Sequence, residues 1–275
     1  MSVAVACSLS DGFILGVDSA VTVRCGRGNK VYDNAEKIFQ LGSKRVGIAI
    51  YGVAGLGERS IGSFIREFES KDPGGTISRE CSVGQIAEAL RLFFLDAYLA
   101  NDGVWLEERF KKPFDDIPLE DKPLLGLVVG GYSSGSYLSE LWEVLVPNHS
   151  SENSGVCLST PGLFGLRWFA TSKPIQRYLN GIDYDLLFEI QHYVETLLGR
   201  KLSEEEQQDV GRLVKTYQYR YVYSSMPIES GVQCVRFLVD LVINHFRFVD
   251  ADSVVGGRPK LGIVTYRGES FQLLD

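Results

Sequence analysis

The chain has 275 residues, of which 45% are hydrophobic, and its 28 Lys and Arg against 35 Asp and Glu give a net charge of −7. A chain of this length can bury a sizeable core without disulfides or metal ions. Its acidic balance, with no basic run longer than two residues, gives no electrostatic support to a nucleic-acid partner. No apolar run approaches the ~18 residues that a membrane-spanning helix needs, so we expect no membrane partner.

The N-terminal stretch and the cysteines indicate a cytoplasmic protein. The first basic residue is Arg24, so the chain lacks the positively charged start of a signal peptide. The five cysteines lie far apart and form no CxxC pair, which is typical of free thiols in a reducing compartment. They are Cys7, Cys25, Cys81, Cys157 and Cys234.

Two β-hairpins open the chain, and two helices follow. Small and β-branched residues predict a hairpin that starts at residue 2 or 3 and turns at Asp11-Gly12. Residues 36–52 predict the second hairpin. Apolar residues at helical spacing then predict helices within 54–70 and 82–100, the latter with Ser82 as its N-cap. We expect these helices to pack on a sheet.

The rest of the chain repeats this alternation of strands and helices. Residues 101–122 are charged and interrupted by prolines, which indicates a solvated insertion. The pattern predicts a third hairpin, three helices and two closing strands, within 123–146, 182–199, 203–215, 227–249 and 260–274. Such an order is typical of an α+β fold in which two antiparallel sheets carry helices on their outer faces. We expect one domain over residues 1–275.

Three motifs do not support the chemistry that they resemble. GYSSG at 131–135 matches G-x-S-x-G, but an esterase nucleophile there needs a helix after Ser133, and the next residues predict a strand. The three histidines have no His or Cys three or four residues away, so we expect no metal site and no cofactor. The alternating tyrosines of 217–223 fit a half-buried packing face better than a base-stacking platform.

Ser2 is a candidate nucleophile that carries its own base. Met before a small residue is normally removed, and the freed α-amine of Ser2 has an unperturbed pKa of ~7.7–8.0. An amine can activate a nearby hydroxyl toward an acyl-enzyme, provided that the N-terminus is held rigidly, as the first residue of a sheet is. No propeptide precedes Ser2 in the sequence, so we expect no self-cleavage step.

A nucleophile of this kind also needs a cation that lowers the pKa of the hydroxyl and a carboxylate that holds the cation. Asp18 is predicted to end the second strand, on the side where residue 2 begins the first strand, and Lys37 enters the next hairpin. Spacing alone favours a simpler interpretation, in which Asp18 caps a turn and Lys37 lies on the surface.

Several segments together resemble proteasome β-type subunits. SVAVACSLSDGFILGVDSAVT, NAEKIFQL and RVGIAIYGVAG are similar to the N-terminal half of that family, and GLRWFATSKPIQRYLNGID and DADSVVGGRPKLGIVT to later segments. The resemblance implies the N-terminal-nucleophile (Ntn) hydrolase fold, a four-layer αββα sandwich with two antiparallel sheets between helical layers. It covers most of the chain as one domain, with insertions at about 101–122 and 196–225.

The resemblance also implies catalytic roles for single residues. Ser2 falls at the nucleophile, a position that Thr usually holds. Lys37 falls at the catalytic lysine, and Asp18 at the carboxylate that holds this lysine. Gly52 falls at the residue whose backbone N–H faces the developing oxyanion. Asp252 falls at the acidic residue near the nucleophile.

The same alignment implies a substrate-binding region with small or apolar side chains. It places a substrate-binding loop at Ala20, Val21 and Thr22. It places Ala35, Ile50 and Ala54 near the first specificity pocket. We therefore expect a preference for an apolar residue on the acyl side of the scissile amide.

The chain departs from the family pattern at three positions. Ser2 lacks the methyl group with which Thr restricts the rotamer of the hydroxyl. Val255 stands where a supporting Ser is expected, and no clear match to the second supporting Ser exists near Ala170, Thr171 and Ser172. These departures leave the support of the nucleophile weaker than in the family.

The sequence therefore predicts a proteasome-like hydrolase that cleaves peptide or amide bonds through an acyl-enzyme on Ser2. The expected partners are a peptide or protein substrate and further copies of the chain in a homo-oligomer or ring. The alternative is a catalytically inactive structural or assembly subunit with the same fold, which the missing supporting serines favour. The further alternative is an esterase that uses Ser133.

Overall fold

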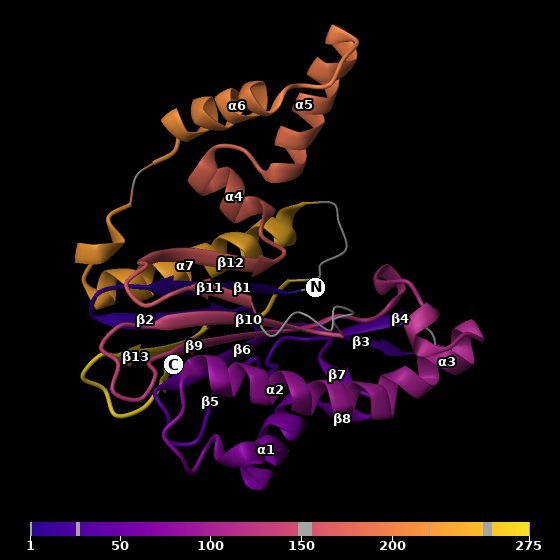
Figure 1. Ribbon diagram of the computed structural model, residues 1–275, viewed down its shortest axis with the longest axis vertical. Coiled ribbons are helices and arrows are strands. Elements are labelled where there is room, and N and C mark those ends of the chain that lie inside the picture. Colours follow the sequence, from indigo (N-terminus) through magenta and orange to yellow (C-terminus); the bar gives the residue numbers. More distant parts are fainter. Residues whose placement is uncertain (1, 26–27, 148–155, 220, 250–254, 275) are drawn as a thin grey trace. The chain divides into compact units, whose positions relative to one another are not determined.

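The computed structural model describes residues 2–25, 28–147, 156–219, 221–249 and 255–274 (Figure 1). The chain divides into two units, the first made of residues 1–170 and 223–275 and the second of residues 171–222. The single-domain prediction stays a prediction, and each unit is described by itself.

The first unit contains two five-stranded antiparallel sheets. The sheet that begins the chain has the strand order β12-β1-β2-β13-β14, with bounds Gly165–Ala170, Val3–Ser8, Gly12–Val17, Lys260–Thr265 and Gln272–Leu274. The second sheet has the order β11-β10-β9-β6-β5, with bounds Val156–Ser159, Glu140–Val146, Leu125–Gly131, Val46–Gly52 and Ile38–Gln40. Two further antiparallel pairs of strands complete the unit. β3, Val21–Cys25, pairs with β4, Gly28–Tyr32, and β7, Gly55–Leu56, pairs with β8, Arg59–Ser60.

Helices cover the outer face of each sheet (Figure 1). α1, Ile61–Lys71, and α2, Val83–Tyr98, bury their apolar faces in one core with β6, β9 and β10. α7, Ile228–Phe248, packs on β1 and β2 of the other sheet. The first unit is thus a four-layer sandwich of helices, sheet, sheet and helix.

The two sheets pack face to face through large side chains that lie over glycines. Phe271 is fully buried, and a Cβ at Gly47 of one sheet or Gly262 of the other would lie 2.3 Å from its ring. Phe13 of β2 fills the space above Gly130 of β9 in the same way. Because a glycine on one sheet accepts a ring from the other, the sheets approach closely and the inner layer is dry.

The second unit is helical. It contains α4, α5 and α6, with bounds Lys173–Asn180, Tyr184–Leu198 and Glu204–Thr216. Asp183 caps α5, and Ser203 with Glu206 forms a capping box at the start of α6.

Local structure departs from the sequence predictions at two places. The chain from 99 continues as a π-helical turn, Leu99–Gly103, into α3, Val104–Phe110, so the predicted insertion is partly helical. Single 3₁₀ turns lie at Pro73–Gly75, Phe114–Asp116, Leu119–Asp121 and Tyr223–Ser225. The half-buried face predicted for the tyrosines is wrong for Tyr217 and Tyr219, which are 78% and 79% exposed.

The segment after Ser133 is a turn followed by β10, as the sequence predicts. Ser133 Oγ bonds to the Glu140 carboxylate and accepts the N–H of Val83 at 3.0 Å. Since no helix follows residue 135, the geometry of an esterase elbow is absent here. Within the described parts of the chain, no helix has the length and apolar character that crossing a membrane requires.

Candidate active site

The N-terminal strand runs through the interior of its sheet. β12 and β2 flank β1, with Val3 opposite Ala170 and Ala4 opposite Val17. Ser2 directly precedes this strand and is 3% exposed. Hydrogen bonds to both neighbouring strands hold the backbone beside Ser2, so its side chain has a fixed position at the end of the sheet.

Lys37 connects Ser2 to Asp18. Its Nζ donates a hydrogen bond to Ser2 Oγ at 2.9 Å and another to Asp18 Oδ1 at 2.9 Å. Lys37 is 5% exposed and Asp18 is fully buried. The Lys37 backbone is fixed as well, because its carbonyl accepts the N–H of Ile50 in the neighbouring strand β6 at 2.8 Å. The structure thus brings together the three residues that the sequence singles out.

Asp18 is held by backbone donors from separate segments. Its Oδ1 accepts the N–H of Val3 at 3.1 Å, and its Oδ2 accepts the N–H groups of Ala20 and Gly256, each at 3.3 Å. A buried carboxylate is stable only when such donors replace its lost hydration. The carboxylate therefore fixes the start of β1, the end of β2 and the segment that leads into β13 around one point.

Ser19 reinforces this junction, and sequence reasoning missed it. Its Oγ donates to the carbonyl of Asp33 at 2.6 Å and accepts the N–H of Arg258 at 2.9 Å. Its carbonyl accepts the N–H of Ala35 at 2.8 Å. Gly257 makes this approach possible, because it has a φ of +71° and a Cβ there would lie 2.3 Å from Ser19 Oγ. The Gly-Gly pair before Arg258 was the available signal.

Burial lowers the pKa of the Lys37 ammonium below its usual range. The cause is loss of hydration in the interior, and the nearby Asp18 carboxylate opposes it in part. A lower pKa raises the fraction of neutral amine near neutral pH. A neutral Lys37 amine at hydrogen-bond distance from Ser2 Oγ can accept the hydroxyl proton.

Gly52 is the last residue of β6 and is exposed. It has a φ of +87°, and a Cβ there would lie 2.0 Å from the carbonyl oxygen of Leu124, so only glycine fits. Asp252 lies outside the described residues. Val255 is 1% exposed, so an apolar side chain is buried at the position where the resemblance expects a hydroxyl.

The residues expected to bind substrate differ in exposure. Ala20 is 4% exposed, Val21 and Thr22 are half-buried at the start of β3, and Ala54 is exposed. Ala35 is half-buried. Ile50 is 4% exposed and belongs to the core that β6 shares with α1 and α2. The substrate preference that these residues imply stays a prediction.

Ser172 belongs to the second unit, and within that unit its hydroxyl is already bonded. Its Oγ accepts a hydrogen bond from Gln176 Nε2 at 2.9 Å, one turn further along α4. The structure gives no second supporting serine for the site among the described residues of the first unit near Ala170.

The comparisons with known proteins concern the fold. No protein-family model and no curated protein matches the sequence. Among solved structures 272 chains match, including the Gly-1 mutant of Anbu from Hyphomicrobium sp. strain MC1, with a TM-score of 0.56 and 13% identity. This match covers 100% of the chain and 85% of the Anbu chain. At this identity the match shows the fold alone, and the predicted α+β fold, with two antiparallel sheets between helical layers, is confirmed.

The buried ion pair of Lys37 and Asp18 leads to a prediction about stability. Lys37→Met removes the cation and leaves the Asp18 carboxylate buried without its charged partner, so we expect the free energy of unfolding to fall by about 3–5 kcal/mol. Urea unfolding at neutral pH measures it. The exposed Lys112→Met is the matched control, with an expected change within about 0.5 kcal/mol.

The double variant Asp18→Asn/Lys37→Met distinguishes the effect of an unpaired buried charge from a general loss of packing at Lys37. Because it buries no uncompensated charge, we expect it to be more stable than Lys37→Met alone. Equal stability of Lys37→Met and the unmodified protein would show that the pair does not hold the site together.

Proposed function

We propose that the chain is an Ntn hydrolase that cleaves peptide or amide bonds through an acyl-enzyme on Ser2, once Met1 has been removed. The observation that carries this proposal is the position of Lys37 Nζ, which lies 2.9 Å from both Ser2 Oγ and Asp18 Oδ1. A buried hydroxyl, amine and carboxylate in line are the groups that such a mechanism requires. The fold supports it, because the matching Anbu structure is proteasome-like.

The first half of the reaction forms the ester. Ser2 Oγ attacks the carbonyl carbon of the substrate amide while its proton passes to a neutral amine, that of Lys37 or of the Ser2 N-terminus. The negative charge that develops on the carbonyl oxygen is stabilised by the backbone N–H of Gly52. The C–N bond then breaks, and the leaving amine takes the proton.

The second half releases the acyl group. Water replaces the leaving amine, gives a proton to the same base and attacks the ester carbon. The ester C–O bond breaks and Ser2 Oγ recovers its proton. Asp18 takes no part in bond making; it holds Lys37 beside Ser2 in both halves.

The second candidate is an inactive structural subunit. The observation that favours it is Val255, which is 1% exposed and has no hydroxyl at a position where the family pattern has a supporting serine. Retention of Met1 in the mature protein would favour this candidate further, because the α-amine of Ser2 would then be an amide.

Acylation of Ser2 tests the proposal directly. We expect brief exposure to a β-lactone to add one acyl group per chain, and peptide mapping to place it on Ser2 of a chain without Met1. Ser2→Ala should abolish the adduct because it removes the nucleophile, and Lys37→Ala because it removes the amine that hydrogen-bonds to Ser2 Oγ. Intact mass measures each result.

Ser133→Ala is the matched control for this labelling. It removes the rival serine of GYSSG and should leave the adduct unchanged. Retained Met1 with no adduct would contradict the hydrolase and leave the structural subunit.

The lowered pKa of Lys37 makes a separate prediction. We expect Lys37 to titrate below the ordinary lysine value of ~10.4, because burial disfavours its charged form. As the pH falls through this value, the amine becomes protonated and acylation should slow. Lysine ¹³Cε NMR titration measures the midpoint, and Lys37→Arg assigns the resonance. A midpoint at or above ~10.4 would contradict the base role.

We further propose a homo-oligomer, for which α5 of the second unit supplies the support. None of its residues is buried, although most of its long side chains are apolar. The exposed ones are Tyr184, Leu186, Phe188, Ile190, Tyr193, Leu197 and Leu198. Four of them, Leu186, Ile190, Tyr193 and Leu197, recur at steps of three and four and so share one face of the helix, and an exposed apolar face of this kind is typical of a protein interface.

Sedimentation velocity at micromolar concentration tests this assembly. We expect the unmodified protein to sediment as a species larger than the 30.6 kDa chain, and Ile190→Glu/Leu197→Glu to sediment closer to 30.6 kDa, because two carboxylates buried in the interface oppose association. Lys201→Glu, an exposed change outside α5, is the control. A monomer for the unmodified protein would contradict the proposal.

A further inference from the structure

The hydroxyl of Ser19 joins two segments that lie far apart in the sequence. Ser19 is fully buried, and its Oγ donates to the carbonyl of Asp33 at 2.6 Å and accepts the N–H of Arg258 at 2.9 Å. A hydroxyl has one hydrogen to donate, so the bond to Asp33 uses its whole capacity as a donor. The two bonds connect the residue after Asp18 to the segment that leads to Lys37 and to the segment that leads into β13.

The first segment determines how the chain approaches Lys37. In addition to the bond between Ser19 Oγ and the Asp33 carbonyl, the Ser19 carbonyl accepts the N–H of Ala35 at 2.8 Å, two residues before Lys37. On the other side, the Lys37 carbonyl accepts the N–H of Ile50 at 2.8 Å. The Lys37 backbone is therefore held between Ser19 and β6, and this placement fixes the start of its side chain.

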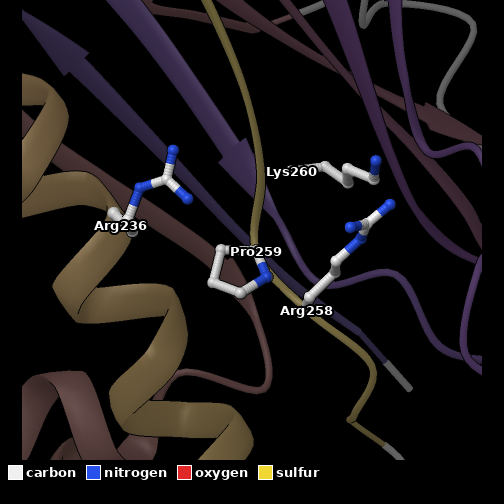
Figure 2. A pocket seen from close by; sticks show the side chains of 4 residues that line it. All are labelled: Arg236, Arg258, Pro259 and Lys260. Atoms are coloured by element: carbon white, nitrogen blue, oxygen red, sulfur yellow. The ribbon is translucent and has the colours of Figure 1, made fainter. Parts of the chain in front are cut away.

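The second segment supplies a donor to Asp18. Gly256 gives its N–H to Asp18 Oδ2 at 3.3 Å, and Arg258 gives its N–H to Ser19 Oγ. Pro259 restricts the backbone of Arg258, because it disfavours helical dihedral angles in the residue before it. Figure 2 shows the Arg258 side chain extending away from α7, and the bond to Ser19 uses only the backbone N–H. Ser19 thus holds the segment that solvates the buried carboxylate.

Gly257 shows how closely these segments fit around the hydroxyl. A Cβ at Gly257 would lie 2.3 Å from Ser19 Oγ and 2.5 Å from the carbonyl oxygen of Asp33. Its φ of +71° also favours glycine. The hydroxyl and the two segments leave no space for a side chain between them, so the position of the hydroxyl is coupled to the spacing of both segments.

We propose that Ser19 is a positioning residue of the candidate active site, whose hydroxyl holds Lys37 where its Nζ meets both Ser2 Oγ and Asp18 Oδ1. The hydroxyl acts through the two segments that it joins, one leading to Lys37 and one carrying a donor to Asp18. The effect of Ser19 on Lys37 stands by itself, and only its effect on acylation rests on the proposed function.

Loss of this hydroxyl leaves two buried polar groups without their partner. Ser19→Ala removes the donor to the Asp33 carbonyl and the acceptor of the Arg258 N–H. Buried groups of this kind are satisfied by ordered water when the protein offers no partner. We therefore expect water to enter beside the segment that leads to Lys37, and the Lys37 amine to move relative to Ser2 Oγ.

This change raises the pKa of Lys37. Burial lowers that pKa and the Asp18 carboxylate opposes the effect, so added hydration moves the pKa upward, toward ~10.4. The charged groups on the neighbouring elements are Asp18 after β2, Lys260 at the start of β13 and, once Met1 is removed, the α-amine of Ser2 before β1. β6 carries no charged residue. Ser19→Ala alters none of these charges, so a shift reports the surroundings of the amine.

Lysine ¹³Cε NMR titration of Ser19→Ala in the full chain tests the proposal. We expect the Lys37 midpoint to rise relative to that of the unmodified protein. We also expect β-lactone labelling of Ser2 at pH 7, followed by intact mass, to slow about tenfold or more, because the amine is displaced and more often protonated. An unchanged Lys37 midpoint in folded Ser19→Ala would overturn the proposal.

Ser159→Ala is the matched control for the loss of a buried hydroxyl. Ser159 is 4% exposed, and its Oγ donates to the carbonyl of Leu163 at 2.8 Å. It belongs to β11, at the opposite edge of the sheet from β5. We expect Ser159→Ala to lower the melting temperature and to leave the Lys37 midpoint and the labelling rate unchanged. A merely structural role for Ser19 predicts this same result for Ser19→Ala.

Gly257→Ala reaches the same hydroxyl from the other side and keeps the test open where Ser19→Ala does not fold. Its Cβ displaces Ser19 Oγ, so we expect the same rise of the Lys37 midpoint. Gly181→Ala is its control, because Gly181 has a φ of +75° and a Cβ there would meet nothing within 4 Å in the described chain. Gly181→Ala should leave the midpoint unchanged.

The two readouts separate this proposal from the hydrolase activity. A raised Lys37 midpoint in Ser19→Ala and Gly257→Ala, with no Ser2 adduct in the unmodified protein, would contradict the hydrolase and leave Ser19 as the residue that positions Lys37. An adduct in the unmodified protein, with the Lys37 midpoint unchanged in both variants, would contradict the positioning role and leave the hydrolase.

Discussion

The burial of the Asp18 carboxylate is the constraint on which the site depends. A carboxylate at zero exposure loses its hydration, and the protein replaces it with three backbone N–H groups and the Lys37 ammonium. Ala20 lies two residues after Asp18, whereas Val3, Lys37 and Gly256 belong to three other segments, so the charge is fully satisfied only when those three segments are in place. Ser2 is positioned by this same arrangement, because Val3 donates to Asp18 and Lys37 donates to Ser2. The contacts that stabilise the buried Asp18 carboxylate therefore also fix the position of the candidate nucleophile, Ser2.

The same contacts order Ser2, which directly precedes an interior strand. Terminal residues usually fray, since few contacts hold them. Here β1 lies between β12 and β2, and α7 covers its outer face, so the residue before it inherits the order of an interior strand. Glycines between the two sheets also contribute to the order of this region. Gly47, Gly130 and Gly262 let rings from the opposite layer lie against the backbone, which brings the two sheets close and keeps water from the inner layer. A lysine at the rim of such a layer is poorly hydrated, which is the cause of the lowered pKa of Lys37.

Sequence reasoning recovered the parts of this structure that local patterns encode. The hairpin of β1 and β2, the N-cap at Ser82 and the helix α7 are encoded locally, and each is seen in the structure. Spacing alone could not bring Lys37 to Asp18, because nothing in the residues between them fixes the angle at which one hairpin follows the other; the family resemblance supplied that step. Ser19 and Gly256 were missed because their partners lie some 240 residues away in sequence, at 239 and 238 positions. Tyr217 and Tyr219 were misjudged because alternation shows a face but not whether another layer covers it.

Val255 is buried at the position where the family resemblance expects a serine. Val255 precedes Gly256, whose N–H bonds to Asp18, so the backbone contact is kept while the hydroxyl is absent. In the described part of the chain, Lys37 Nζ has Ser2 Oγ and Asp18 Oδ1 as its hydrogen-bond acceptors. A lysine with fewer acceptors holds its proton less tightly, and an apolar neighbour in the chain adds no hydration. Burial, which the Asp18 carboxylate opposes only in part, therefore favours the neutral Lys37 amine. In such a site a larger fraction of Lys37 is neutral and available to accept the proton from Ser2, although each neutral amine is a weaker base than an exposed lysine.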